Sequence, residues 1–254
     1  MQAAIQRMAE AITAIVPTHS IWLYGSTVLD DFHLGWSDID LIVLTRAAIT
    51  QRQAEQLLTL RQALSAREPG NPYYRCFEGV LVSLEEYRAG RFTRVVYWGT
   101  SGQRITDRCD VDAFARQELA FHGRRVYGEG DRSLFSPPSQ AELTAAVRRH
   151  YEGIRACAAQ TDDSLYACGW LLDIARCIYT LRYHDVIAKT RAGEWALAEK
   201  IFDDDAALRR ALIIRRQPLA YKDRPETKAW LKSLGSTVQR YADALEREWS
   251  GPNP

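Results

Sequence analysis

The amino-acid sequence predicts an α+β fold, with a mixed sheet and helices in an N-terminal domain and a bundle of helices in a C-terminal domain. Up to about residue 110, short apolar runs of strand length alternate with segments of helical periodicity. From Val111 onward, apolar residues recur at helical spacing. The stretch SLFSPPSQ, residues 133–140, has the composition of a linker. We therefore expect one domain at residues 1–135 and a second at residues 139–254.

The elements of the first domain follow from where these patterns start and stop. Ile5, Met8, Ile12 and Ile15 recur at helical spacing until Pro17 ends the helix. The stretch EPGNP ends a second helix in the same way. The expected elements are a helix at 1–16, strands at 21–24 and 38–45, a helix at 51–66, and strands at 76–83 and 91–98.

The rest of the chain is expected to be helical. The run VDAFARQELAFHGRRV, residues 111–126, has helical spacing and belongs to the first domain. Four further candidate helices lie near residues 139–159, 164–183, 191–216 and 226–248. Together they predict an all-α C-terminal domain.

Composition restricts the class of ligand. The chain of 254 residues is 46% hydrophobic and carries 33 basic and 32 acidic side chains, for a net charge of +1. This balance gives no general attraction to nucleic acids or anionic membranes, so we expect neither as a partner and infer a small ligand. Five cysteines without a C-x-x-C pair are typical of reduced thiols, so we expect a cytoplasmic protein.

Two aspartates, Asp38 and Asp40, stand in a strand that is otherwise apolar. Side chains alternate across a strand, so both carboxylates point to the same face. A carboxylate removed from water costs several kcal/mol unless a cation or a hydrogen-bond array compensates it. The pair can therefore form a platform for Mg²⁺, although an isolated D-x-D more often caps a turn or faces solvent.

The Gly25-Ser26 pair before this strand strengthens the metal interpretation. Glycine lets a phosphate approach the backbone, serine supplies a hydroxyl, and free N–H groups would be added if Thr27 opened a helix. A plain turn is the common alternative for such a pair. The order strand, Gly-Ser, linker, Ser37-Asp38-x-Asp40, strand favours a triphosphate site beside a metal site.

A third carboxylate is expected on a neighbouring strand, and Glu78 in CFEGVLV is the candidate. Three carboxylates and two Mg²⁺ ions are the usual apparatus for in-line displacement at a phosphate. The alternative is an edge-strand glutamate that faces water or binds Arg75 or Arg94.

The stretch LYGSTVLDDFHLGWSDIDLIVLT resembles the signature of the polymerase-β-like nucleotidyltransferase superfamily. It is most similar to that of the aminoglycoside adenylyltransferases, which act on streptomycin and spectinomycin. The resemblance implies a nucleotidyltransferase fold for the first domain and a helical domain that completes the ATP and acceptor cleft. It assigns Asp38 and Asp40 to metal binding, Glu78 to the metal site as catalytic base, and Gly25, Ser26 and Ser37 to the nucleotide.

Three further nucleotide contacts are implied by this resemblance. The run RCDVDAF is similar to the family's I-D-I-D segment, whose second aspartate contacts ATP, and this points to Asp112. The segment LLDIARCIYTLRYHDVIAKTRAGEWAL is similar to the family's helical R-I-W-Y segment and its later lysine. That similarity assigns an ATP-phosphate role to Lys189. The family's ATP-contacting tyrosine falls on Tyr221 in RRQPLAY.

The acceptor site is also placed by resemblance. Trp98 in VVYWGT corresponds to a tryptophan that packs on streptomycin, although a core tryptophan is an equal alternative. The loop AAQTDDSLYACGW offers Asp162 for the first drug-binding aspartate, while the second falls on Tyr166 unless Asp163 takes its place. Spectinomycin is therefore expected to be the poorer substrate.

The resemblance implies an enzyme that uses ATP and two Mg²⁺ ions to transfer AMP to a hydroxyl of a small cationic acceptor, above all an aminoglycoside such as streptomycin, which would confer antibiotic resistance. A different metabolite or a protein partner that becomes AMPylated remains open, as does a catalytically silent nucleotide-binding regulator. The complete set Asp38, Asp40 and Glu78 argues against silence, and the large helical domain argues against a minimal AMPylating form. We expect a monomer.

Overall fold

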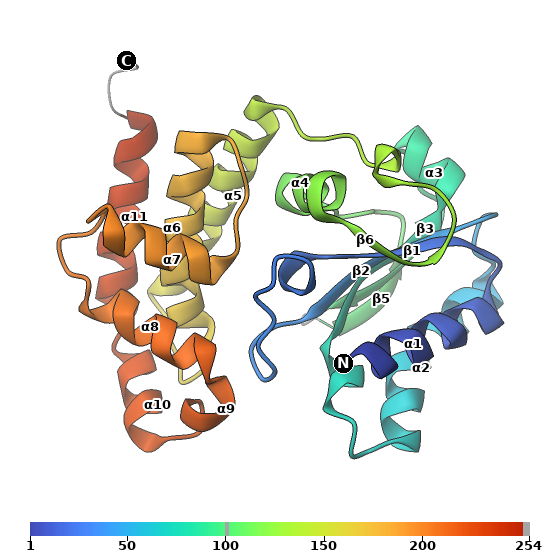
Figure 1. The fold of residues 1–254 in the computed structure, drawn as a ribbon, viewed down its shortest axis with the longest axis horizontal. Helices are drawn as coiled ribbons and strands as arrows, with labels where there is room; N and C mark the ends of the chain where they lie inside the picture. Colours follow the sequence, from blue (N-terminus) through green and yellow to red (C-terminus); the bar gives the residue numbers. More distant parts are fainter. Residues whose placement is uncertain (100–101, 251–254) are drawn as a thin grey trace. The chain divides into compact units, whose positions relative to one another are not determined.

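The computed structural model describes residues 1–99 and 102–250 and divides into two compact units (Figure 1). Residues 1–30 and 37–137 form the first, here called the sheet unit, and residues 31–36 and 138–254 form the second, the helical unit. A single division near residue 135 does not describe this arrangement, because the short segment 31–36 packs with the helices. Residues 251–254, at the end of the expected second domain, lie outside the described residues.

The strands of the sheet unit form one mixed sheet of six strands in the order β5-β4-β3-β2-β1-β6 (Figure 1). Strands β2 and β3 pair in parallel, and the other neighbours pair antiparallel. The expected mixed sheet is confirmed. The strands are β1 Thr18–Tyr24, β2 Ile39–Thr45, β3 Phe77–Ser83, β4 Val95–Gly99, β5 Gly102–Thr106 and β6 Arg124–Gly128.

The two edge strands were not expected from the sequence. Residues 124–126 were assigned to the end of a helix, but that helix ends at His122 and the chain continues as β6. The sequences of β5 and β6, GQRIT and RRVYG, hold few apolar residues and are mostly exposed or half-buried. An edge strand that buries little has no alternating apolar pattern to reveal it.

Helices cover both faces of the sheet (Figure 1). One face packs on α1 (Gln2–Ile15) and α2 (Gln51–Arg67), which begins with a capping box of Thr50 and Gln53. The other face packs on α3 (Leu84–Ala89) and α4 (Ala113–His122). The core on this second face consists of Trp22, Ile42, Leu44, Val80, Val82, Val95, Leu119 and Phe135.

The helical unit starts its main body at α5, where Ser139 and Glu142 form a second capping box directly after the linker. The expected helix at 191–216 is divided into α7 and α8 by the acidic stretch 203–205, and the one at 226–248 is divided into α10 and α11 near Gly235. The helices are α5 Gln140–Ala158, α6 Tyr166–Tyr183, α7 Lys189–Ala198, α8 Ala206–Arg216, α9 Pro218–Tyr221, α10 Pro225–Lys232 and α11 Gly235–Ser250. In the described part of the chain, no helix combines the length and the apolar character required to cross a bilayer.

The close approach of the parallel strands β2 and β3 requires a glycine at position 79. Its φ is +143°, and a Cβ atom there would lie 1.8 Å from the carbonyl oxygen of Leu41 on β2. We expect Gly79→Ala to lower the free energy of unfolding by about 3 kcal/mol or more, because the strand must move or distort. Urea denaturation measures this difference.

Gly70→Ala is the matched control, since no described atom lies within 4 Å of a Cβ built at that position. It should change stability by less than about 0.5 kcal/mol. Equal stability of the two variants would contradict the close approach of β2 and β3.

Candidate active site

Carboxylates meet where the two parallel strands begin. Asp40 on β2 and Glu78 on β3 are direct partners in the parallel register. Neighbouring strands lie about 4.8 Å apart, so the two side chains emerge next to each other. Asp38 lies two residues before Asp40 and, by the alternation of side chains, belongs to the same face. The structure therefore brings Glu78 to the aspartates, as the sequence predicts.

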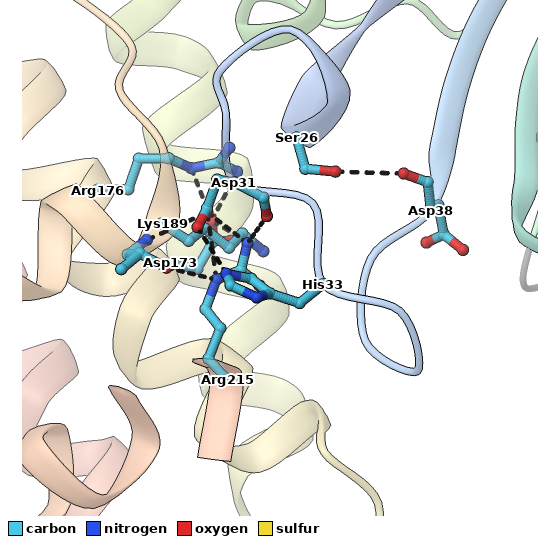
Figure 2. Close-up of polar contacts among 9 residues, drawn as sticks. Ser26, Asp31, His33, Asp38, Asp173, Arg176, Lys189 and Arg215 are labelled. Atoms are coloured by element: carbon cyan, nitrogen blue, oxygen red, sulfur yellow. Dashed lines mark hydrogen bonds and ion pairs between the residues drawn. The ribbon is translucent and has the colours of Figure 1, made fainter. Parts of the chain in front are cut away.

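The turn after β1 packs directly on Asp40. Gly25 has φ of +67°, and a Cβ atom there would lie 2.1 Å from Oδ2 of Asp40, so only glycine permits this contact. The hydroxyl of Ser26 donates to the backbone carbonyl of Asp38 over 3.2 Å (Figure 2). The Gly-Ser turn and the aspartates are thus one connected structure.

Thr27 does not open an α-helix. Residues Gly25–Thr27 form a single 3-10 turn, and the Thr27 hydroxyl donates to the carbonyl of Tyr24 over 2.9 Å. Ser37 lies buried just before Asp38. A turn this short provides no helix dipole for an anion, so any binding of phosphate here depends on the serine hydroxyl and local backbone groups.

Glu118 on α4 is a member of the site that sequence analysis missed. It is only 4% exposed, and its Oε2 accepts a hydrogen bond of 3.0 Å from the backbone N–H of Gly25. Burial, together with the charges of Asp40 and Glu118, raises the pKa of Tyr24 well above its usual value. Glu118 stands in an ordinary helical sequence, so no local signal distinguishes it from a surface glutamate.

Asp112 lies at the start of the same helix. It is the N-cap of α4 and accepts a hydrogen bond of 2.8 Å from the N–H of Ala115. Its charge also contributes, after burial, Asp40 and Glu118, to the raised pKa of Tyr24. Asp112 therefore caps a helix close to the carboxylate group, and its contact with ATP stays a prediction.

Tyr97 on β4 orients Glu78. Its hydroxyl donates to Oε1 of Glu78 over 3.1 Å, and the guanidinium of Arg104 lies 4.0 Å from the centre of its ring. Arg94, which sequence analysis considered as a partner of Glu78, instead donates to the carbonyl of Ile49 over 2.7 Å. Glu78 is thus held in one orientation by a neutral donor.

Trp98 does not lie on this face, and its expected place beside the acceptor needs correction. It is fully buried, and its indole N–H donates to the carbonyl of Leu57 on α2 over 3.0 Å. Adjacent residues of a strand point to opposite faces, so Trp98 packs under α2 while Tyr97 faces the carboxylates. The core alternative is the one that the structure shows.

A cation lies near the carboxylates. Arg61 on α2 donates to the carbonyl of Phe77 and to the side chain of Gln103. Burial lowers the pKa of Arg61, and the opposing effect of Glu78 and Asp38 shows that these charges lie near it. Arg61 therefore offsets part of the negative charge at the start of β2 and β3.

The described residues, 1–99 and 102–250, contain no group of three His, Cys, Asp or Glu side chains arranged to hold a metal ion. The expected set of Asp38, Asp40 and Glu78 is thus not a complete site by itself. Mg²⁺ commonly binds one or two carboxylates and takes its other ligands from water and substrate phosphates. The adjacent carboxylates at the start of β2 and β3 suit a site in which the protein supplies only some of the ligands of the ion.

A separate charged cluster is built inside the helical unit around Asp173 on α6 (Figure 2). Its carboxylate accepts from His150 over 2.9 Å and from Arg176 over 2.7 Å, and it lies 3.5 Å from Nζ of Lys189. Burial would raise the pKa of Asp173, but Lys189, Arg176 and His150 hold it well below its usual value. No sequence pattern distinguishes Asp173 as a site residue. Its carboxylate holds Arg176 and Lys189, which both belong to the segment that resembles the family's helical segment.

The other expected residues of the helical unit lie on its surface. Asp162 is exposed and accepts hydrogen bonds from the backbone N–H and the hydroxyl of Ser164, which lower its pKa. Asp163 is half-exposed and forms an ion pair of 3.6 Å with Lys232. Tyr221 ends α9, and the guanidinium of Arg224 lies 4.5 Å from the centre of its ring. Their contacts with ATP or an acceptor stay predictions.

Comparison with known proteins yields matches for both units. Residues 5–77 match the family model described as nucleotidyltransferase domain, and residues 133–244 match the model described as aminoglycoside adenylyltransferase, C-terminal domain. The structure is similar to that of spectinomycin adenyltransferase AAD(9) from Enterococcus faecialis, solved with ATP and spectinomycin. That likeness has a TM-score of 0.66 and 16% identity, and it covers 95% of this chain and 98% of that chain. No curated protein sequence gives a significant match.

The Asp173 cluster predicts a strong effect on stability. Asp173→Asn should lower the free energy of unfolding by about 3–5 kcal/mol at neutral pH, because it removes the buried carboxylate that pairs with the partly buried side chains of His150, Arg176 and Lys189. A carboxyl group with a lowered pKa stabilises the fold above its unfolded pKa and loses this contribution as the pH falls through the folded value. The difference between variant and wild type should therefore shrink below about pH 4.

Asp163→Asn serves as the control, because its ion pair with Lys232 is exposed on the surface. We expect a change below about 1 kcal/mol. Urea denaturation at several pH values compares the two variants, and equally small effects would show that the Asp173 cluster contributes nothing to folding.

Proposed function

We propose that this chain, which belongs to the aminoglycoside adenylyltransferase family and is a nucleotidyltransferase, transfers AMP from ATP to a hydroxyl of a small cationic acceptor with the help of Mg²⁺. The observation that carries the proposal is the parallel register that sets Asp40 beside Glu78, next to the turn of Gly25 and Ser26. A base, metal-binding oxygens and a close backbone turn are the elements that phosphoryl transfer requires.

In the proposed reaction, Glu78 takes the proton of the acceptor hydroxyl. The acceptor oxygen then forms a bond to the α-phosphorus of ATP, the bond from that phosphorus to the bridging oxygen breaks, and pyrophosphate leaves with the electron pair. The hydrogen bond from Tyr97 holds the Glu78 carboxylate in one orientation while its second oxygen can receive the proton. AMP becomes attached to the acceptor.

Asp38 and Asp40 would hold Mg²⁺, with Glu78 beside them. When bound, the ion would neutralise charge on the phosphates, and two such ions are the common arrangement in this chemistry. The carboxylates that raise the pKa of Tyr24 concentrate negative charge here, which favours a cation. Gly25 lets the turn lie directly against the Asp40 carboxylate, and Ser26 and Ser37 supply hydroxyl groups.

Lys189, Tyr221 and Asp112 are proposed to contact ATP, as the family resemblance implies. Support for Lys189 comes from its surroundings in the helical unit, where Arg176 and His150 add positive charge beside it. Cationic side chains gathered at the start of α7 favour an anionic ligand such as a triphosphate.

The acceptor is proposed to be an aminoglycoside, with streptomycin as the first candidate and spectinomycin as the second. Exposed carboxylates at Asp162 and Asp163 suit cationic sugars. The similar structure of AAD(9) was solved with spectinomycin, which makes that drug a necessary arm of the test.

Incubation of the protein with Mg²⁺, each NTP, and a panel of aminoglycosides, followed by mass spectrometry, tests the proposal. A drug whose mass rises by one AMP supports it and identifies the acceptor. If only a protein became nucleotidylated, the acceptor would be a protein partner and not an aminoglycoside. A panel with no adduct of any kind would overturn the proposal.

Glu78→Gln should slow transfer by about 10²–10⁴-fold while the affinities for ATP and acceptor stay close to wild type, because a base acts chiefly in the chemical step. Steady-state kinetics give kcat and KM, and a magnesium titration shows whether the variant needs more Mg²⁺. Glu85→Gln, on the exposed side of α3, is the control and should keep full activity. Full activity of the Glu78 variant would exclude it from the site.

Asp38→Ala and Asp40→Ala should each abolish transfer and leave the chain folded, because the carboxylates serve the metal and contribute little to packing. Asp107→Ala, an exposed aspartate after β5, is the matched control for the loss of one charge. Circular dichroism confirms folding, and the transfer assay measures activity. Near wild-type turnover in either variant is incompatible with the metal assignment.

A further inference from the structure

The segment 31–36 is attached to the helical unit by a buried ion pair. Asp31 is 4% exposed and Arg215 on α8 is 3% exposed, and Nη2 of Arg215 lies 2.5 Å from Oδ2 of Asp31 (Figure 2). The same guanidinium also donates to the backbone carbonyl of Asp31 over 3.3 Å. Burial would raise the pKa of Asp31, but Arg215 and Thr190 lower it, so the carboxylate stays charged.

The pair also binds the start of α7. Ala188 precedes this helix, and its methyl side chain cannot cap it. Instead, Oδ2 of Asp31 accepts a hydrogen bond of 3.3 Å from the N–H of Thr190, and Nε of Arg215 donates to the Thr190 hydroxyl over 3.1 Å. A residue 159 positions away in sequence thus supplies the capping acceptor. Lys189 is the first residue of the capped helix.

Further contacts fix the whole segment rather than Asp31 alone. His33 lies 3.2 Å from the second oxygen of Asp31, and the ring of Trp36 lies 5.3 Å from the Arg215 guanidinium. Gly35 has φ of +92°, and a Cβ atom there would lie 2.6 Å from Leu219. The segment is therefore firmly packed with α8 and α9, and the chain continues from its two ends to Ser26 and to Asp38.

We propose that Asp31 and Arg215 are positioning residues, which tie the start of α7, with Lys189, to the segment of chain that joins Ser26 to Asp38. The expected effect of these two residues on ATP binding rests on the proposed function, in which Lys189 contacts the phosphates of ATP. A lysine has a long and flexible side chain, so its use as a phosphate ligand depends on how firmly its backbone is placed. Capping by Asp31 provides that placement at the first turn of the helix.

The test replaces the ion pair by apolar residues, as Asp31→Leu together with Arg215→Met. This double change removes both charges of the buried ion pair together, so the protein is expected to fold. Asp31→Asn keeps an acceptor oxygen for the N–H of Thr190 but leaves the buried Arg215 guanidinium without its carboxylate, so it separates the capping contact from the ion pair. Asp30→Asn is the matched control, since Asp30 is the exposed neighbour and asparagine tolerates its φ of +54°.

The first measurement is amide hydrogen exchange of the first turn of α7, without nucleotide. The apolar pair should speed exchange there at least about tenfold, and Asp30→Asn should leave it unchanged. Unchanged exchange in the apolar pair would overturn the capping role. This result does not depend on nucleotide binding, so it stands even if the wild-type protein binds no ATP and the proposed function fails.

The second measurement is the dissociation constant for ATP with Mg²⁺. The apolar pair should weaken binding about tenfold, with a smaller effect for Asp31→Asn and none for Asp30→Asn. In a Lys189→Ala background the apolar pair should cause no additional loss, because its effect acts through that lysine. An equal loss in both backgrounds would show a general structural role and overturn the assignment as positioning residues.

Discussion

The parallel pairing of β2 with β3 is the constraint on which the sheet unit depends. Its register sets Asp40 beside Glu78, two carboxylates that repel each other and need compensation. Gly79 allows the two strands to approach, and Gly25 allows the preceding turn to lie against Asp40. A larger residue at either glycine would separate the elements that hold the carboxylates together.

The residues around Asp40 and Glu78 change the local charge and fix the orientation of the carboxylates. Tyr97 donates a hydrogen bond to Glu78, and Arg61 contributes a positive charge that is itself partly buried. Glu118 adds negative charge and binds the backbone of Gly25. The carboxylates are therefore held by a rigid scaffold and lie in a concentration of negative charge, which also raises the pKa of Tyr24.

In the helical unit the charges that need compensation are positive, because the side chains of Arg176, Lys189 and Arg215 are partly or fully buried. Asp173 holds Arg176 and Lys189, and Asp31 holds Arg215. Asp173 on α6 pairs with Lys189 on α7, and Asp31 in the segment 31–36 pairs with Arg215 on α8. These ion pairs therefore connect different elements of the unit, and they also lower the free-energy cost of removing the charges from water. The segment 31–36 belongs to this unit for the same reason: Arg215 would otherwise be a buried charge without its main partner.

The sequence by itself determined the α+β class, the central strands, most helices and the family, because apolar periodicity, capping residues and the motif around Asp38 and Asp40 are local signals. It pointed to Glu78 because a third carboxylate was expected on a neighbouring strand and because the family resemblance assigns a base there, and the parallel register sets Glu78 beside Asp40. Only the tertiary structure revealed β5 and β6, whose exposed edges carry no apolar pattern. Only the tertiary structure decided that Trp98 is a core residue, and that Asp31, Glu118 and Asp173 have partners far away in sequence. Long-range pairing leaves no local pattern, because a side chain's role there depends on which distant residue the fold brings to it.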